Sequence, residues 1–403
     1  MIFSIPSDME QYLDSALHLI AENVRITEKQ EQECEQKFNA ITGLLDGSEI
    51  AKFRPVLRLQ GSMRLGTAIR SITNSEKYDV DIVVEFLNLP MNYTPCDLKN
   101  AVGNVLKNSD RYKGMIVPPD GGKRCWTLEY ADGTHIDLLP AAISNNYIRS
   151  IALGFNGNFN DFELRITDKT RYPEYYIETD RSKWLVSNPI GFAEWFFTQA
   201  RAHEEKRIVN ECKSFQAAIE PFPQRTEKML PLQEIICLLK RHRDKMFGQD
   251  KEKPISMIIT VLASKAYAYA KSGNLFITML NIANQMINMM ETVDGKRVVL
   301  NPVNPKEDFT DRWRREDGGQ REAKFYRWVQ RLKDDLMSLT ECRRVDIGRK
   351  LKEMFGHDQI MLTALEQLGR KGLEENKSLK MLSSGVFAAA GTITAKANTF
   401  YGK

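Results

Sequence analysis

The segment DVDIVVEF, residues 79–86, constrains the fold more than any other part of the chain. Valine and isoleucine fill its centre, which is typical of a strand, and the carboxylates Asp79 and Asp81 flank its first valine. Because side chains alternate between the two faces of a strand, both carboxylates project from one face, about 7 Å apart. Such close carboxylates repel each other, and a divalent cation between them removes that penalty. The segment therefore predicts a sheet that carries a cation site.

A third carboxylate lies on another predicted strand. Asp137 stands between apolar residues in HIDLLPA, and residues 124–130 and 135–139 have the pattern of a hairpin with its turn at 131–133. This hairpin can bring Asp137 alongside the first two carboxylates. Mg²⁺ binds to a few carboxylates together with substrate phosphates, so three carboxylates on neighbouring strands predict a two-metal site.

The dipeptide Gly61-Ser62 precedes the first carboxylates, between a predicted strand at 56–59 and a predicted helix at 64–72. Glycine lets the backbone approach a ligand closely, and the amides at a helix N-terminus favour anions. A triphosphate on this dipeptide, bridged by metal to the carboxylates, is an arrangement for nucleotidyl transfer. Taken singly, a Gly-Ser pair is usually a turn and an Asp-x-Asp is usually solvated surface. The combination of these motifs, in this order along the chain, is far more specific for a nucleotidyl-transfer site.

Composition excludes several other classes of protein. The 403-residue chain has 57 basic and 53 acidic residues, and a net charge of +4 is too small for a protein that coats nucleic acid. Its six cysteines form no Cys-x-x-Cys pair and its five histidines no His-x-x-x-His pair, which argues against zinc-binding motifs. The acidic beginning, without a long apolar run, lacks the features of a signal peptide, and we expect a cytoplasmic protein without a membrane span.

Periodicity divides the chain into a mixed region and a helical region. Residues 1–50 predict two helices, at 8–24 and from a Thr27/Gln30 capping box to residue 45, and residues 51–185 predict a small sheet with helices. Residues 186–375 predict a helical domain, and residues 376–403, rich in small residues, predict a flexible tail. The expected helices of the second half lie at 190–206, 229–246, 255–271, 274–291, 320–338 and 346–369.

The order LQGSMRLGTAIR, YDVDIVVEF and HIDLLPA resembles the polymerase-β-like nucleotidyltransferase superfamily. The later blocks LQEIICLLKRHRDKMF, KPISMIITVLASKAY and NPVNPKEDFTDRW narrow the resemblance to the bacterial CD-NTases. These are the cGAS/DncV-like enzymes of CBASS antiphage systems, relatives of animal cyclic GMP-AMP synthase and oligoadenylate synthase. The resemblance spans residues 55–315.

The resemblance implies an α+β, bilobal fold, in which a nucleotidyltransferase lobe with a small central sheet faces a helical lobe, and N-terminal helices brace both. It implies that Gln60, Gly61 and Ser62 bind the nucleotide through its triphosphate. It further implies that the three aspartates are catalytic and bind two Mg²⁺ ions, for which Mn²⁺ can substitute.

Two residues of the later blocks also match nucleotide-binding positions of the family. Lys240 in LLKRHRD matches a lysine that reaches the donor phosphates, and Ser256, behind Pro254, matches a serine with the same role. Both assignments agree with elementary physics, since a lysine neutralises a triphosphate and a helix N-terminus favours anions. Read without the family, Lys240 is equally a solvated helix residue and Ser256 a plain helix cap.

The implied activity is template-independent synthesis of a cyclic di- or trinucleotide from ATP and/or other NTPs, with release of pyrophosphate. The product would act on an effector protein, and binding of nucleic acid is not required. The tail more weakly resembles those of CD-NTases with ubiquitin-ligase-like partners, although Lys403 follows its last glycine. One alternative is a nucleotidyltransferase that modifies an RNA or protein acceptor, as a toxin or a tRNA-end polymerase does. Another is a catalytically silent nucleotide-binding scaffold.

Overall fold

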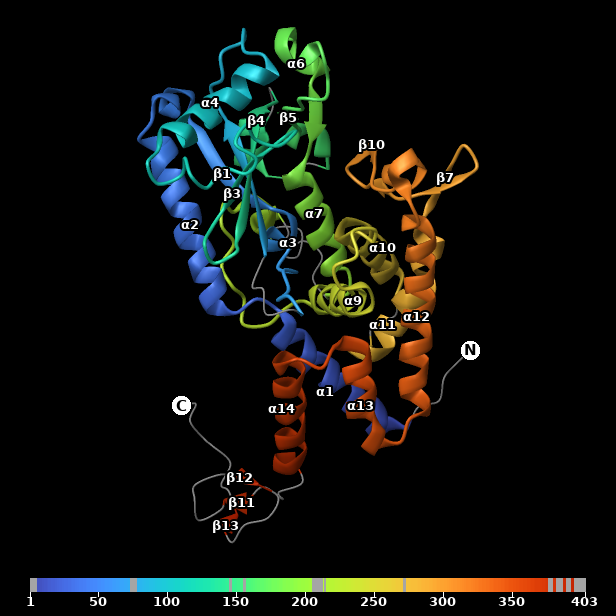
Figure 1. The fold of residues 1–403 in the computed structure, drawn as a ribbon. Coiled ribbons are helices and arrows are strands. Elements are labelled where there is room, and N and C mark those ends of the chain that lie inside the picture. The colour runs from blue at the N-terminus through green and yellow to red at the C-terminus, as the bar shows by residue number, and fades with distance from the viewer. Residues whose placement is uncertain are drawn as a thin grey trace.

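The fold is taken from a computed structural model of the chain (Figure 1). It describes residues 6–72, 78–144, 147–154, 157–204, 213, 215–270 and 273–375, and three short strands between residues 380 and 394. The rest of the predicted tail at 376–403 lies outside the described residues.

A six-stranded sheet forms the centre of the first half of the chain. Its strands are β1 (Pro55–Gln60), β2 (Asp79–Phe86), β3 (Trp126–Glu129), β4 (His135–Ile143), β5 (Leu164–Ile166) and β6 (Leu185–Ser187). The order is β1-β2-β4-β5-β6, with β3 paired to β4. β2 and β4 run parallel, and the other neighbours run antiparallel. The predicted hairpin is confirmed, because β3 and β4 are joined by a turn in which Gly133 has a φ of +84°.

Helices pack on both faces of this sheet. α2 (Glu28–Asp46) and α4 (Pro95–Asn108) share a hydrophobic core with the side chains of β2 that alternate with the aspartates. The opposite face, which carries Val83 and Leu139, packs into a second core together with α7 (Pro189–Ala200). The sheet therefore separates two cores, and this confirms the predicted mixed α+β class.

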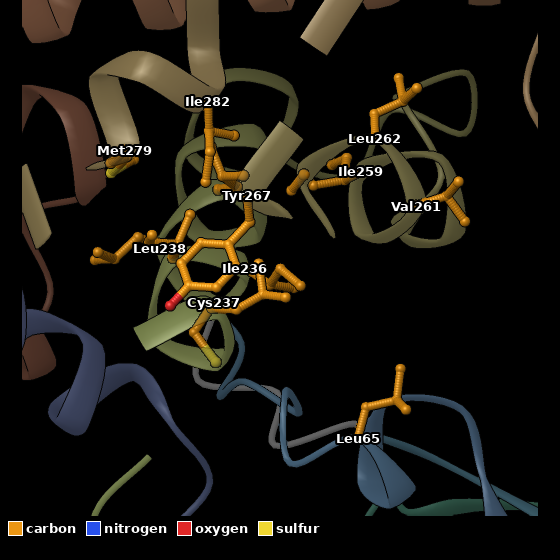
Figure 2. Close-up of a cluster of buried hydrophobic side chains, with 14 of the residues drawn as sticks. Leu65, Ile236, Cys237, Leu238, Ile259, Val261, Leu262, Tyr267, Met279 and Ile282 are labelled. Carbon is orange, nitrogen blue, oxygen red and sulfur yellow. The ribbon is translucent and has the colours of Figure 1, made fainter. Parts of the chain in front are cut away.

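The second half of the chain is helical, as predicted. Its helices are α9 (Pro231–Phe247), α10 (Ser256–Tyr269), α11 (Leu275–Gln285), α12 (Arg321–Glu341), α13 (Arg344–Phe355) and α14 (Gln359–Glu375). Figure 2 shows part of their core, with labelled side chains from α9, α10 and α11. Leu65 belongs to the same cluster, although it lies in the sheet region of the sequence. A residue near the predicted Gly-Ser site is therefore anchored in the helical core.

The two N-terminal helices contact different cores. α1 (Ser7–Val24) packs against α14, α9 and α11, whereas α2 packs on the sheet (Figure 1). The predicted capping box is present at the start of α2, where Thr27 accepts a hydrogen bond from the backbone N–H of Gln30. The domain boundaries at residues 50, 185 and 375 stay predictions.

Two predicted helices differ from the structure. In place of a helix at 64–72, a single turn, α3 (Gly61–Arg64), follows β1 directly, and the chain then passes through Gly66 with a φ of +64°. In place of one helix at 346–369, α13 and α14 are separated at Gly356, whose φ is +119°. At both breaks a glycine adopts a left-handed conformation that other residues rarely accept.

Shorter elements complete the chain. They are α5 (Tyr147–Leu153), α6 (Glu174–Ile177), β7 (Glu291–Val293), β8 (Lys296–Val298), β9 (Leu300–Asn301), β10 (Asn304–Asp308), β11 (Lys380–Met381), β12 (Phe387–Ala388) and β13 (Ile393–Thr394). In the last three, β11 pairs with both β12 and β13, inside the tail that was predicted to be flexible. Among the described helices, none is both long and apolar enough to cross a membrane.

Gly103 tests the packing of α4 on the sheet. A Cβ at this position would overlap the ring of Trp126, whereas a Cβ at Gly348 in α13 would meet nothing within 4 Å. We expect Gly103→Ala to lower the free energy of unfolding by about 1–3 kcal/mol through overpacking. The matched Gly348→Ala should raise it by up to about 1 kcal/mol, because alanine favours helix. Urea unfolding measures both, and equal effects would contradict the described packing.

Candidate active site

The three predicted carboxylates lie on the two parallel strands at the centre of the sheet. In the β2–β4 register Asp81 stands beside Asp137, and Asp79 stands beside His135. On its other side Asp81 pairs with Gln60, the last residue of β1. Neighbouring strands lie about 4.8 Å apart, so the backbone pairing itself places two aspartates next to each other. The structure thus brings Asp137 to the first two carboxylates, as the sequence predicts.

The environments of the aspartates differ. The side chain of Asp79 is 78% exposed, and its Oδ1 lies 3.6 Å from Nδ1 of His135. Asp81 is only partly exposed. Asp137 is oriented by the neighbouring strand β3, because the hydroxyl of Thr127 donates a hydrogen bond to its Oδ1. The second oxygen of Asp137 is therefore the one available to another group.

The pKa of Asp81 reflects the electrostatics of the site. Burial raises its pKa to about 7, and the negative charges of Asp137 and Asp79 add to the effect, while Lys240 opposes it. Burial, followed by the charges of Asp137 and Asp81, raises the pKa of the neighbouring Cys125 thiol to about 12. Both shifts have one physical cause, which is excess negative charge in a partly desolvated place. A cation bound here would favour the ionised carboxylates.

The carboxylates fit Mg²⁺ in the way that nucleotide-dependent enzymes hold it. Within the described part of the chain, no three His, Cys, Asp or Glu side chains are grouped closely enough to hold a metal ion alone. Mg²⁺ usually takes one or two carboxylates from the protein and completes its coordination with water and substrate phosphates. The paired aspartates and the raised pKa of Asp81 fit that requirement, so Asp79, Asp81 and Asp137 are the residues that would hold the ions.

The Gly-Ser loop, residues 61–67, lies against Asp81. Gly61 has a φ of +62°, and a Cβ there would overlap Oδ2 of Asp81. Glycine is therefore required for two reasons. The backbone is left-handed here, and Asp81 leaves no room for a Cβ. The carbonyl of Ser62 accepts a hydrogen bond from the amide of Thr67 at 2.9 Å, which closes the loop on itself.

Lys240 reaches this loop from α9. It is 4% exposed, and its Nζ donates to the carbonyl oxygen of Thr67 at 3.0 Å and to the Thr67 hydroxyl at 3.1 Å. Burial lowers the pKa of Lys240 to about 8, and the Asp81 carboxylate is among the charges that oppose this shift. A cation from the helical region thus contacts the Gly-Ser loop and interacts electrostatically with Asp81.

Ser256 begins α10 and has a different partner. Its hydroxyl accepts a hydrogen bond from Nη1 of Arg243 at 2.8 Å. Arg243 in turn forms two hydrogen bonds of 2.9 Å with Asp244. The predicted contact of Ser256 with phosphate stays a prediction.

A large cleft, with a volume of about 1370 Å³, is lined by Asp137, one of the three carboxylates. The sheet region contributes Asp137 and Arg124 to its wall, and the helical region contributes Asn304, Asp308 and Arg312. The cleft lies between the two regions and is wide enough for more than one ligand of ordinary size.

Sequence reasoning missed the side chains that hold the Gly-Ser loop from behind. Arg64, 3% exposed, donates to the carbonyl oxygens of Leu59 at 3.0 Å and Ala217 at 3.1 Å. Gln233 in α9 donates to the carbonyl of Leu65 at 2.8 Å. The bonds of Arg64 to Ala217 and of Gln233 to Leu65 join residues more than 150 positions apart, and no local pattern signals them.

Comparison with known proteins agrees with this geometry. Residues 55–140 match the family model "Cyclic GMP-AMP synthase DncV-like, nucleotidyltransferase domain". A c-di-GMP synthase of Roseivirga ehrenbergii is 26% identical over 350 residues, which cover 85% of this chain and 84% of that protein. The cyclic dinucleotide synthase CdnG of Bradyrhizobium diazoefficiens is 22% identical, and the match covers 94% of this chain and 89% of that protein.

Solved structures show the same fold. The structure of the B. diazoefficiens CD-NTase CdnG in complex with GTP has a TM-score of 0.61 at 20% identity, and covers 89% of this chain and 99% of that one. The structure of E. coli MS115-1 CdnC with ATP has a TM-score of 0.53 at 12% identity, and the match covers 85% of this chain and 97% of that one. The expected bilobal architecture is confirmed at the level of the fold.

Gly61 offers a direct test of the loop geometry. We expect Gly61→Ala to abolish nucleotidyl transfer, because the added Cβ must displace either the loop or Asp81. Gly295, in the β7–β8 turn, has a similar φ of +71° but open space around its Cβ position. Gly295→Ala should cost a similar amount of stability, about 1 kcal/mol, and leave the activity intact. Activity in both variants, measured with matched thermal unfolding, would contradict the close contact.

The raised pKa of Asp81 predicts a pH-dependent stability. Because its pKa is about 7 in the folded protein and lower in the unfolded chain, its favourable contribution is complete in acid and is lost as the pH rises through 7. Without metal, Asp81→Asn should therefore be more stable than the wild type by about 1–3 kcal/mol at pH 8, and nearly equal to it at pH 4. Urea unfolding at the two pH values measures this difference.

Addition of Mg²⁺ at pH 8 provides the complementary measurement. The ion should stabilise the wild type by binding the ionised carboxylates, and should stabilise Asp81→Asn much less. An Asp81→Asn variant that is less stable than the wild type at pH 8 without metal would refute the assigned charge repulsion.

Proposed function

We propose that the chain is a CD-NTase, a nucleotidyltransferase that makes a cyclic di- or trinucleotide from NTPs without a template. Both curated relatives carry the name of a cyclic dinucleotide synthase, and they match this chain over most of their length. We further propose that the enzyme works in the cytoplasm in antiphage defence, where its product acts on an effector protein.

One observation carries this proposal. The parallel register places Asp81 directly beside Asp137, and Gly61 lies against the same Asp81 carboxylate. Carboxylates for metal and a backbone loop for phosphate therefore converge on one point. The cleft of about 1370 Å³ opens beside that point and offers room for a donor and an acceptor nucleotide.

The donor triphosphate is held by the Gly-Ser loop in this scheme. The backbone of Gly61 and the hydroxyl and amide of Ser62 contact the phosphates, next to Gln60. Lys240 contacts the same loop from α9 through its bonds to Thr67 and supplies a positive charge. Ser256 at the start of α10 adds a hydroxyl from the helical region. When bound at the three aspartates, two Mg²⁺ ions, or Mn²⁺ in their place, orient the triphosphate and stabilise the charge at its α-phosphorus.

The acceptor is the ribose hydroxyl of a second nucleotide. Its oxygen forms a bond to the α-phosphorus of the donor, the bond from that phosphorus to the bridging oxygen breaks, and pyrophosphate leaves. The hydroxyl proton passes to Asp137, at the oxygen that Thr127 does not occupy. Repetition with the roles of the nucleotides exchanged closes the ring.

The tail keeps its predicted role as a contact for a ubiquitin-ligase-like partner. This proposal rests on sequence resemblance alone, because the end of the chain lies outside the described residues.

Incubation of the purified protein with all four NTPs and Mg²⁺ tests the function. We expect a small phosphatase-resistant product, identified by mass spectrometry, and no product from Asp79→Ala/Asp81→Ala. Asp110→Ala/Asp334→Ala is the matched control, since both of its aspartates are exposed and should not affect synthesis. Synthesis by the first double variant would refute the site. Transfer only to an added RNA or protein would favour the alternative acceptor.

A further inference from the structure

The hydroxyl of Ser256 is held by one buried arginine of the preceding helix. Arg243 lies in α9 and is 6% exposed. Its Nη1 donates to the Ser256 hydroxyl at 2.8 Å and to the carbonyl oxygen of Pro254 at 3.1 Å. α9 packs against α10 (Figure 1), so one guanidinium fixes both the first residue of α10 and the turn before it.

The other edge of this guanidinium is bound by Asp244. Nε and Nη2 of Arg243 each donate to a carboxylate oxygen of Asp244 at 2.9 Å, which makes the pair bidentate. Nζ of Lys253 donates to the same carboxylate at 2.7 Å. Burial acts to raise the pKa of Asp244, but the charge and hydrogen bonds of Arg243 and Lys253 outweigh burial and lower it. The ionised carboxylate therefore fixes the plane of the guanidinium.

Arg243 itself is poorly placed to bind a phosphate. Its four hydrogen bonds to protein groups engage most of the five N–H donors of the guanidinium. Ser256 differs, because none of the described residues accepts a hydrogen bond from its hydroxyl, and the residue is only partly buried. With Arg243 bound at one lone pair, the O–H is directed away from the guanidinium and is polarised into a stronger donor.

Arg243 shares its face of α9 with Lys240. Residues three positions apart on a helix are neighbours, and Lys240 holds Thr67 in the Gly-Ser loop. Burial lowers the pKa of Lys240 to about 8, and the positive charge of Arg243 acts in the same direction, as expected of neighbouring cations. One face of α9 therefore positions the Gly-Ser loop and Ser256 together.

We propose that Arg243 is a positioning residue for nucleotidyl transfer, because it holds the Ser256 hydroxyl ready to donate a hydrogen bond to the triphosphate of the donor nucleotide. Ser256 is the first residue of α10, where the helix dipole also favours an anion. Arg243 acts through Ser256 and contacts no phosphate itself. The proposal rests on the proposed function, since it requires a triphosphate at the start of α10.

A double-variant cycle tests this role by titration calorimetry on the full chain with Mg²⁺. The probes are the α,β-methylene analogues of ATP and GTP, which cannot transfer their nucleotide. Ser256→Ala should weaken binding about tenfold, as loss of a hydrogen bond to a charged group implies, and Arg243→Gln should weaken it about as much. The double variant should bind no more weakly than Ser256→Ala, because Arg243 then has no hydroxyl to position.

Arg241→Gln is the matched control. Arg241 follows Lys240 on α9 and is fully buried, but its Nε donates to the carbonyl of Phe355 at 2.7 Å, away from Ser256. Its loss should lower the temperature of thermal unfolding and leave the affinity for the analogues unchanged. Full affinity in Arg243→Gln, additive weakening in the double variant, or failure of the wild type to bind either analogue at millimolar concentration would overturn the proposal.

A milder variant keeps the test decisive if Arg243→Gln does not fold. Asp244→Asn retains the shape of the side chain but removes its charge, so the guanidinium of Arg243 is held less firmly. The affinity should fall severalfold while Ser256 is present, and should not fall further in the Ser256→Ala background. An equal fall in both backgrounds would contradict the positioning role.

Steady-state kinetics separate positioning from a general loss of structure. Arg243→Gln should raise the KM for NTP about tenfold and leave kcat within about twofold, since the hydroxyl binds the triphosphate both before and during transfer. A lower kcat with an unchanged KM would refute the role. If no nucleotide product forms, while binding of the analogues still depends on Arg243 only when Ser256 is present, the proposed function fails and the positioning role stands.

Discussion

The rest of the structure depends on how the Gly-Ser loop is held. Its first residue can approach Asp81 only because it lacks a side chain, and the loop then needs support from elsewhere. Lys240 and Gln233, seven residues apart on α9, hold two of its carbonyl groups, and Arg64 ties it to the segment around Ala217. Such bonds are buried, where an unmade hydrogen bond costs about 1–3 kcal/mol. The helical region therefore helps to hold the loop that we propose as the phosphate-binding site.

The second constraint is electrostatic. Parallel pairing of β2 with β4 forces Asp81 and Asp137 into neighbouring positions, where their charges repel. Burial raises the pKa of Asp81, and this repulsion adds to the effect. Active sites commonly retain such local destabilisation because the bound cation and substrate relieve it. Burial, followed by the charges of Asp137 and Asp81, likewise keeps Cys125 as a neutral thiol.

Sequence reasoning located most elements because their hydrophobic patterns are strong. The DVDIVVEF strand, the hairpin and most helices of the second half are confirmed, and the order of motifs predicted that Asp137 joins the other carboxylates. The prediction of a helix at residues 64–72 was wrong. There Gly66 turns the chain, and Ile69 pairs with Arg25 instead of continuing a helix. There a contact distant in sequence outweighed local propensity, which is a weak determinant over so few residues.

The sequence by itself determined which residues can share a face, because the alternation of side chains along a strand is a property of the local backbone. It thereby specified the carboxylates and the need for glycine beside them. Tertiary structure alone decided that Lys240 meets Thr67 and that Arg64 meets the carbonyl of Ala217. Those contacts join segments about 150 or more residues apart, and their geometry is fixed only when both hydrophobic cores pack around the sheet.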